Sequence, residues 1–342
     1  MGYVEWLRVR GCLKWVAIVL DVLFLIAVIV RVALIGRQDY LSWAFNLRSD
    51  PGTKVTETAL PDGTRRIAID DPAKKVHVVV FDRGWQGKRI EIYDYSERGS
   101  SELKNVHVVM GSVSENRLPG GHGTFTVINT NGETDFISYV VNAAFVAFIV
   151  ATVLGAPFAR EGDGHLEIAL TKPLSRLRYS IEVLAIDAVG VIAAFVMTIV
   201  FAIAIHAIFE IPHIVFTASD AWGLIVAILA PIAWHAMLAA ATASLRRGYG
   251  AVIGFAWPVA GIVLALGNAR PDGNAILTIA HDIAWVLNLF NPLAHVNLHN
   301  ESVQFGGPPV FGIGYGNQIA ALAVLILLYC VLSVAQWRRI EA

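Results

Sequence analysis

Residues 13–35 read LKWVAIVLDVLFLIAVIVRVALI, an apolar run interrupted inside by Asp21 and Arg31. A membrane-spanning helix needs about 20 predominantly apolar residues, and this run is long enough to supply them. It is also longer than the roughly 7–15 residues of a signal-peptide core, and no small-residue cleavage site follows it. We therefore expect a retained membrane anchor, with Arg31 close enough to the helix end to reach the membrane surface.

Five further apolar runs follow along the chain, at 136–158, 181–209, 222–245, 249–266 and 318–335. Charged residues make up 15% of the 342 residues, whereas soluble domains average about 25%. The sequence therefore predicts an α-helical integral membrane protein with about six transmembrane helices. Membrane lipid is accordingly an expected partner of the chain.

A polar segment, residues 37–135, separates the first run from the second. Short β-branched or alternating stretches occur in it at 75–81, 89–95, 104–110 and 124–129, between turn residues such as Pro119, Gly120 and Gly121. This pattern predicts a small antiparallel sandwich or roll inserted between the first two helices.

The predicted domains are therefore a cytoplasmic start with the first helix (1–36), the β-rich domain (37–135) and a five-helix remainder (136–342). The remainder contains two notable loops, at 159–179 and 268–317. The second loop holds an amphipathic piece at 279–289, and the sequence leaves open whether that piece is re-entrant or interfacial.

The basic residues near the ends of the runs predict the orientation. With six spans they all fall on one side of the membrane, which the positive-inside rule identifies as the cytoplasm. These residues are Arg8, Arg10, Lys14, Arg160, Lys172, Arg176, Arg178, Arg246, Arg247, Arg338 and Arg339. Both termini are then cytoplasmic, and the β-rich domain is extracytoplasmic because long domains are translocated regardless of their charge.

The segment between the second and third runs, residues 160–176, reads REGDGHLEIALTKPLSR. Gly162 and Gly164 can end the preceding helix, residues 165–170 can form a short amphipathic helix, and Pro173 ends it. Such a helix is expected to lie along the inner membrane face.

The pattern E-x-x-G-x-L-E-x-x-L-[ST]-x-P-[LV]-S-R after a membrane span resembles the cytoplasmic loop of the type-2 ABC exporter permeases. The matching residues are Glu161, Gly164, Leu166, Glu167, Leu170, Thr171, Pro173, Leu174, Ser175 and Arg176. The resemblance covers about residues 137–339 and implies that this loop is a coupling helix that docks on a separate nucleotide-binding ATPase subunit. It also implies a transporter in the bacterial inner membrane that pairs two permeases, as a homodimer or with a second permease. The simpler interpretation is an amphipathic loop without a partner.

The chain has no G-x-x-x-x-G-K-[ST] phosphate-binding loop, so an ATPase activity would belong to the separate subunit, which would also hold ATP and Mg²⁺. We expect no enzymatic activity and no bound cofactor in this chain itself. The formal net charge of −1 excludes a general electrostatic attraction to nucleic acid. The two cysteines, Cys12 and Cys330, both lie in or beside apolar runs and do not suggest a disulfide framework.

Four ionisable residues lie within the apolar runs, namely Asp21, Asp187, His206 and His235. Ionisable groups at membrane depth commonly face the interior of a helix bundle or an aqueous cavity, which makes these four candidates for a transport pathway. The alternative, which we favour, is that each lies near a helix end or is paired locally. Glu182 follows Arg178 by one helical turn, which predicts an ion pair between them.

Three histidines of the polar segment, His77, His107 and His122, suggest a metal site. Alternation along the strands explains the first two as solvent-facing residues, so we predict no metal site.

The sequence favours the permease subunit of an ATP-driven exporter. The alternative function is a membrane-anchored envelope sensor or assembly protein that binds a ligand through its β-rich domain and transports nothing. An intramembrane enzyme is a third possibility, but no set of residues in the sequence suggests a catalytic centre.

Overall fold

The computed structural model describes residues 2–34, 52–61, 63–73, 75–82, 88–94, 112–117, 124–130, 133–161, 176–208, 213–245, 247–269, 275–299, 304–306, 309–312 and 314–340. The chain divides into two compact units. A helical unit comprises Met1–Phe24, Asp135–Ala204 and Phe216–Ala342, and a sheet unit comprises Leu25–Thr134 and Ile205–Val215.

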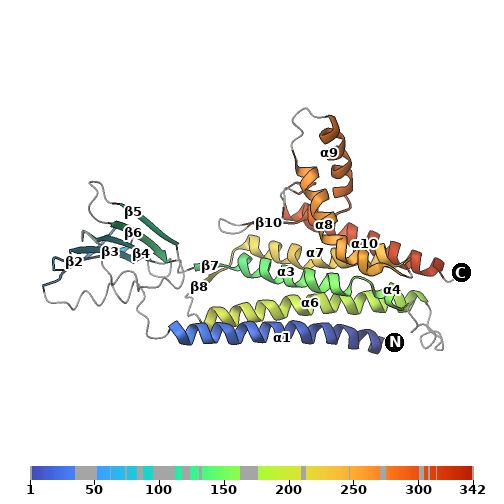
Figure 1. The fold of residues 1–342 in the computed structure, drawn as a ribbon, viewed down its shortest axis with the longest axis horizontal. Helices are drawn as coiled ribbons and strands as arrows, with labels where there is room; N and C mark the ends of the chain where they lie inside the picture. Colours follow the sequence, from blue (N-terminus) through green and yellow to red (C-terminus); the bar gives the residue numbers. More distant parts are fainter. Residues whose placement is uncertain are drawn as a thin grey trace. The chain divides into compact units, whose positions relative to one another are not determined.

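Helices account for most of the described chain (Figure 1). They are α1 (Gly2–Leu34), α3 (Phe136–Leu154), α4 (Pro157–Glu161), α6 (Arg176–Ile208), α7 (Ala218–Thr242), α8 (Tyr249–Asn268), α9 (Ala275–Asn288), the 3-10 helix η3 (Pro292–His295) and α10 (Tyr315–Ile340). Among the described residues, six of these helices are long and apolar enough to cross a membrane: α1, α3, α6, α7, α8 and α10. The expectation of about six such helices is confirmed.

Helix α1 begins at Gly2, well before the apolar run that starts at residue 13. The reason is a tertiary contact, because Val9 is fully buried. It packs against Gly190 of α6 so closely that a Cβ atom added to this glycine would lie 2.5 Å from Val9 Cγ1. The polar start of the chain is therefore held in the helical unit.

The core of the helical unit is built around α7, which packs against α3 and against α10 (Figure 1). Small side chains let these helices approach closely, as is common in membrane bundles. Buried alanines of this core include Ala143, Ala144, Ala147 and Ala151 of α3 and Ala227, Ala230 and Ala233 of α7.

One hydroxyl group links three helices inside this core. Thr152 Oγ1 of α3 accepts hydrogen bonds from the indole N–H of Trp234 on α7, at 2.8 Å, and of Trp257 on α8, at 3.0 Å. The two indole rings lie 4.9 Å apart between centroids and both contact Phe148. This polar contact gives the buried indole of Trp234 and the partly buried indole of Trp257 a partner, which fixes α8 against the bundle.

The segment from 268 to 317 contains a helix, as the amphipathic pattern predicted. Helix α9 packs against α8, and η3 and a short hairpin follow it. The hairpin consists of β9 (Asn297–His299) and β10 (Gln304–Gly306). Asn291 Oδ1 accepts a hydrogen bond from the Leu293 amide at 3.1 Å and so caps η3, while Gln318 Oε1 accepts one from the Asn297 amide at 3.0 Å.

The last residue of η3, His295, is buried. Its Nε2 donates to the Leu289 carbonyl over 3.0 Å, and its ring stacks on Phe311 with the centroids 5.4 Å apart. Burial lowers the pKa of the His295 imidazole below its ordinary value of 6.5, and the hydrogen bond to Leu289 opposes this effect. The fold therefore favours the neutral ring.

The lowered pKa predicts that stability falls in acid. An unfolded chain protonates this histidine near pH 6.5, whereas the folded chain resists protonation, so the stabilisation is complete above that pH and is lost as the pH falls below it. We expect the melting temperature of the detergent-solubilised protein to fall more between about pH 6.5 and 5 than that of His295→Gln. The variant keeps an N–H donor for Leu289 but does not titrate. Equal pH slopes for the two proteins would contradict the prediction.

The described residues of the sheet unit form six antiparallel strands in the order β1-β2-β3-β4-β6-β5. They are β1 (Lys54–Ala59), β2 (Arg65–Asp71), β3 (Val76–Asp82), β4 (Lys88–Asp94), β5 (Ser112–Arg117) and β6 (Thr124–Thr130). Two short strands further along the chain, β7 (Glu133–Asp135) and β8 (His213–Val215), form a separate two-stranded sheet.

The register of the sheet places apolar side chains in rows on one face. Ile67 lies opposite Val80, which lies opposite Ile90, and all three are buried. A second row, Ile69, Val78 and Ile92, is built in the same way. Because side chains alternate along a strand, two such rows produce a single apolar face.

The placement of the sheet differs from the expectation in two respects. In the part of the chain that the structure describes, strands β1 to β6 form one sheet where a sandwich or roll was expected, and they begin at Lys54 rather than at residue 75, the start of the first expected strand. The compact unit also includes Ile205–Val215, far along the chain. The physical reason is that strand pairing and packing are contacts between distant residues, which local composition does not encode. The strand expected at 104–110 lies outside the described residues.

Candidate functional site

The predicted coupling segment starts in α4 and ends in α6. Glu161 is the last residue of α4, and Arg176 is the first residue of α6. The other predicted coupling residues, Gly164, Leu166, Glu167, Leu170, Thr171, Pro173 and Ser175, lie outside the described residues. The structure describes how the two ends of this segment are held by the helical bundle.

The start of the segment is anchored by an aromatic side chain. Phe158 of α4 is fully buried and stacks on Trp337 of α10, with the ring centroids 5.3 Å apart and the planes 29° apart. Residues from three longer helices complete this cluster, which we call the loop-base cluster: Phe158, Val183, Leu184, Ala239, Ala243 and Trp337. Helix α6, which follows the segment, contributes Val183 and Leu184. The helices at both ends of the predicted coupling segment therefore pack in the same cluster.

The corner between α3 and α4 is held against α7 as well. Thr242 Oγ1 donates a hydrogen bond to the carbonyl of Gly155 over 3.1 Å. A Cβ atom on Gly155 would lie 2.7 Å from Leu238 Cδ1, so the close approach requires glycine. The base of the predicted coupling segment is thus rigidly connected to the bundle.

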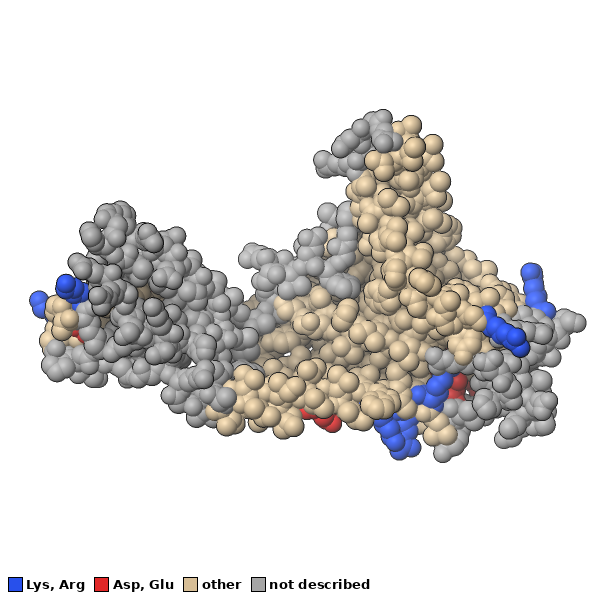
Figure 2. Space-filling model, viewed as in Figure 1, with Lys and Arg blue, Asp and Glu red and all other residues tan. Residues whose placement is uncertain are grey.

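Charged side chains gather at the same end of the helical unit. Helix α4 and both chain termini lie at one end in Figure 1, and Figure 2 shows the described Lys and Arg side chains of this unit concentrated there. The remaining tan surface of the bundle on this face is nearly free of charge. Arg178 forms an ion pair with Glu182 at 2.8 Å, which confirms that prediction.

A buried charged cluster lies deeper in the bundle and joins three helices. Arg8 of α1 donates to both carboxylate oxygens of Asp187 on α6, at 2.7 and 2.6 Å, and also pairs with Glu5 one turn earlier. His235 Nε2 of α7 lies 3.4 Å from Asp187 Oδ2. Asp187 and His235 have exposed fractions of 0% and 2%, so the carboxylate depends on these partners rather than on water.

In the charged cluster (Glu5, Arg8, Asp187 and His235), Asp187 and His235 lie away from the helix ends, whereas Glu5 lies in the first turn of α1. At 1.5 Å per residue, Asp187 lies about 16 Å along α6 from Arg176, and His235 lies about 10 Å before the end of α7. The structure thus brings together two of the four predicted pathway residues, Asp187 and His235, and pairs them. This arrangement favours the pairing interpretation for both.

The other two predicted pathway residues do not belong to this cluster. Asp21 is exposed on α1, and His206 lies about five turns beyond Asp187 on α6. From the sequence, Arg8 was only an orientation signal, and Glu5 was not a candidate. No spacing signal could have found them, because Arg8 and Asp187 are 179 residues apart in the chain.

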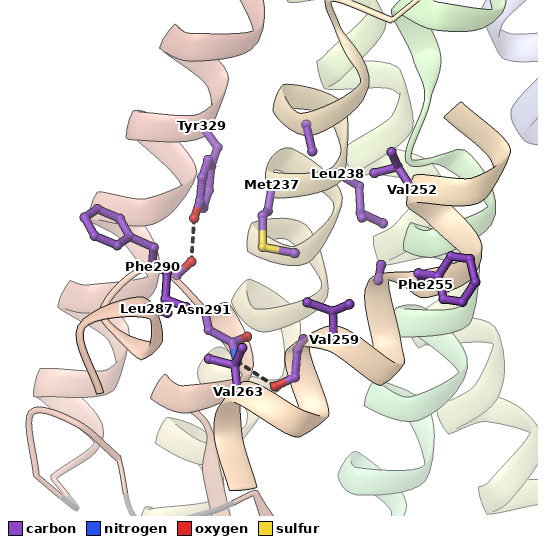
Figure 3. Close-up of a pocket in the computed structure, with 13 residues that line it drawn as sticks. Met237, Leu238, Val252, Phe255, Val259, Val263, Leu287, Phe290, Asn291 and Tyr329 are labelled. Carbon is purple, nitrogen blue, oxygen red and sulfur yellow. Dashed lines mark hydrogen bonds between the residues drawn. The ribbon is translucent and has the colours of Figure 1, made fainter. Parts of the chain in front are cut away.

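A cavity of about 400 Å³ lies between α7, α8, α9 and α10 (Figure 3). Its wall is almost wholly apolar, with Met237, Leu238, Phe255 and Val259 among the lining residues. Its two polar residues are turned to the backbone: the Tyr329 hydroxyl donates to the Phe290 carbonyl, and Asn291 Nδ2 donates to the Ala260 carbonyl at 3.1 Å. The cavity therefore presents no polar group that would orient a ligand.

Of the three histidines considered as metal ligands, His77 alone is among the described residues. His77 lies on β3, half-buried, 3.9 Å from Asp70 Oδ1 and beside the ring of Tyr93. His107 and His122 lie outside the described residues. Among the described residues no group of three or more metal-binding side chains occurs.

Comparison of the chain with protein-family models, with curated proteins and with solved structures finds no match.

Proposed function

We propose that this chain is the permease subunit of an ATP-driven exporter of the type-2 ABC class, moved by a separate nucleotide-binding ATPase subunit. The observation that carries the proposal is the coupling-like sequence at 161–176, together with the rigid anchoring of its base. A lever that transmits force must be stiff where it joins the parts that it moves. Phe158 and Trp337 provide that stiff joint, since large aromatic side chains bury much apolar area.

The arrangement of the helices supports a mechanical connection between the loop and the bundle. The loop-base cluster links α4 and α6 to α7 and α10. About one turn further along α6, the charged cluster links this helix to α1 and α7. Movement of the loop would therefore be passed to four of the six long helices.

The proposed orientation places the loop, both termini and the basic end of the bundle in the cytoplasm of a bacterial cell, with the sheet unit outside the inner membrane. The basic end supports this assignment through the positive-inside rule. ATP and Mg²⁺ would bind to the partner subunit. Two copies of this chain, or this chain and a second permease, would form the transporter.

Co-purification tests the proposal. The tagged chain, solubilised in mild detergent from its own cells, is expected to retain a P-loop ATPase, and the double substitution Glu161→Ala with Glu167→Ala is expected to abolish that retention. The reason is that two carboxylates in a docking loop supply charge-assisted contacts, each worth about 1.5–3 kcal/mol. Mass spectrometry of the purified material identifies the partner.

The matched control is Glu182→Ala, which removes a carboxylate already paired with Arg178 on α6. This variant is expected to retain the ATPase. If the double variant kept the partner and its ATPase stimulation, the coupling role of the loop would be refuted. If no ATPase accompanied even the unchanged chain, the membrane-anchored sensor or assembly protein would become the better interpretation.

A further inference from the structure

A groove of about 570 Å³ runs along the bundle between α6 and α10, with α7 as its floor. Its walls are apolar: Leu177 and Ile181 line one side, and Ile326, Val331 and Val334 line the other. Leu177, Ile181 and Val331 are also exposed to the surroundings of the bundle. The groove is therefore open to the outside of the bundle, where the hydrocarbon chains of a membrane would contact it.

The length of the groove corresponds to one leaflet of a bilayer. The lining residues extend from Leu177 to Ala188 on α6 and from Ile326 to Arg338 on α10. At 1.5 Å per residue each wall is about 17 Å long. Half of a hydrocarbon core about 30 Å thick is about 15 Å, so a single hydrocarbon chain extended from one membrane surface would fit along the walls.

The charge in the groove is confined to one end. Of the described residues that line it, Arg338 alone carries a fixed charge, and it lies in the last turn of α10, at the basic end of the helical unit. The one other titratable group of basic type, His235, forms part of the floor and faces Asp187 of the charged cluster. An exposed guanidinium at the mouth of an apolar groove matches a molecule with an anionic head and an apolar tail.

We propose that this groove binds one anionic amphiphile from the membrane leaflet at the basic end of the bundle, with a phosphate head group at Arg338 and a hydrocarbon chain between α6 and α10. A guanidinium recognises phosphate oxygens through paired hydrogen bonds, which the quaternary ammonium of a choline head group would oppose by charge. The site stands independently of the export function, because neither the groove nor its charge depends on an ATPase partner.

The chain contains a reporter for occupancy of the groove. Cys330 lines it, and the only other cysteine, Cys12, packs against the main core. The full-length Cys12→Ser variant is reconstituted in phosphatidylcholine vesicles with or without phosphatidic acid, and Cys330 is labelled with an uncharged, membrane-permeant maleimide. Phosphatidic acid is expected to slow the labelling about tenfold, the ratio that one charge-assisted hydrogen bond supplies.

Two variants of adjacent arginines distinguish lipid binding in the groove from a general attraction of anionic lipid to the basic end of the bundle. Arg338→Gln, in the Cys12→Ser background, is expected to lose the protection, whereas Arg339→Gln is expected to keep it, because Arg339 is also exposed at the helix end but is not among the residues that line the groove. Size-exclusion chromatography checks that both variants remain folded. Inorganic phosphate added to phosphatidylcholine vesicles is expected to leave the labelling rate unchanged, since it has no tail.

The proposal is overturned if phosphatidic acid does not slow the labelling, if inorganic phosphate alone protects Cys330, or if both arginine variants lose the protection equally. The assay uses no nucleotide and no partner subunit. Protection of Cys330 without any co-purifying ATPase would therefore support lipid binding in the groove and refute the exporter function. A co-purifying ATPase without protection of Cys330 would refute only lipid binding in the groove.

Discussion

Replacing Asp187 by asparagine is expected to lower the free energy of unfolding by about 3–5 kcal/mol, the usual cost of removing one partner of a buried ion pair. The carboxylate is fully buried and accepts two hydrogen bonds from Arg8, and His235 lies beside it. Asparagine would leave the Arg8 guanidinium facing a neutral amide, and α1 would lose its charged attachment to α6. Chemical denaturation in mixed micelles, followed by tryptophan fluorescence, measures the loss.

Two comparisons make this prediction specific to the ion pair. Asp21→Asn removes an exposed carboxylate from α1 and is expected to change stability little. The double variant Arg8→Gln with Asp187→Asn is expected to be less destabilised than the sum of the two single variants, because both single variants lose the same Arg8–Asp187 contact. The pair would be irrelevant to stability if Asp187→Asn behaved like Asp21→Asn.

Phe158→Ala is expected to cost about 3–5 kcal/mol of stability, as is typical for deleting a buried aromatic side chain. The substitution removes the ring that stacks on Trp337 and opens a cavity in the loop-base cluster. Under the proposed function it should also reduce the stimulation of the partner ATPase while the partner still co-purifies, because the docking surface would remain but its joint to the bundle would loosen. Stability and ATPase rate are measured on the same preparation.

Phe145→Ala is the matched control, since Phe145 lies on α3 with an exposed fraction of 52% and leaves little cavity when it is truncated. It is expected to change both quantities little. Phe158→Leu, which keeps most of the buried volume, is expected to restore most of the coupling. An unchanged ATPase rate in a destabilised Phe158→Ala protein would show that the loop base does not transmit force.

Local pattern was sufficient for the long helices and for three strands of this chain. Apolar runs predicted the six long helices because a membrane-spanning helix must be apolar over about 20 residues whatever lies beside it. Strands β3, β4 and β6 were found within a residue or so of their expected positions for a similar reason, because β-branched alternation between turn residues is a local signal. Strands β1, β2 and β5 carried a weaker pattern and were not anticipated.

Contacts between distant segments decided the features that matter for a site. The sequence by itself determined six apolar helices, a β-rich segment after the first of them and a basic end, because composition and periodicity act over a few turns of chain. Only the tertiary structure decided that Arg8 pairs with Asp187, that Phe158 stacks on Trp337 and that Arg338 lies at one end of an apolar groove. The physical reason is that ion pairing, ring stacking and groove shape depend on which helix faces join, and residues more than 150 positions apart leave no local trace of that choice.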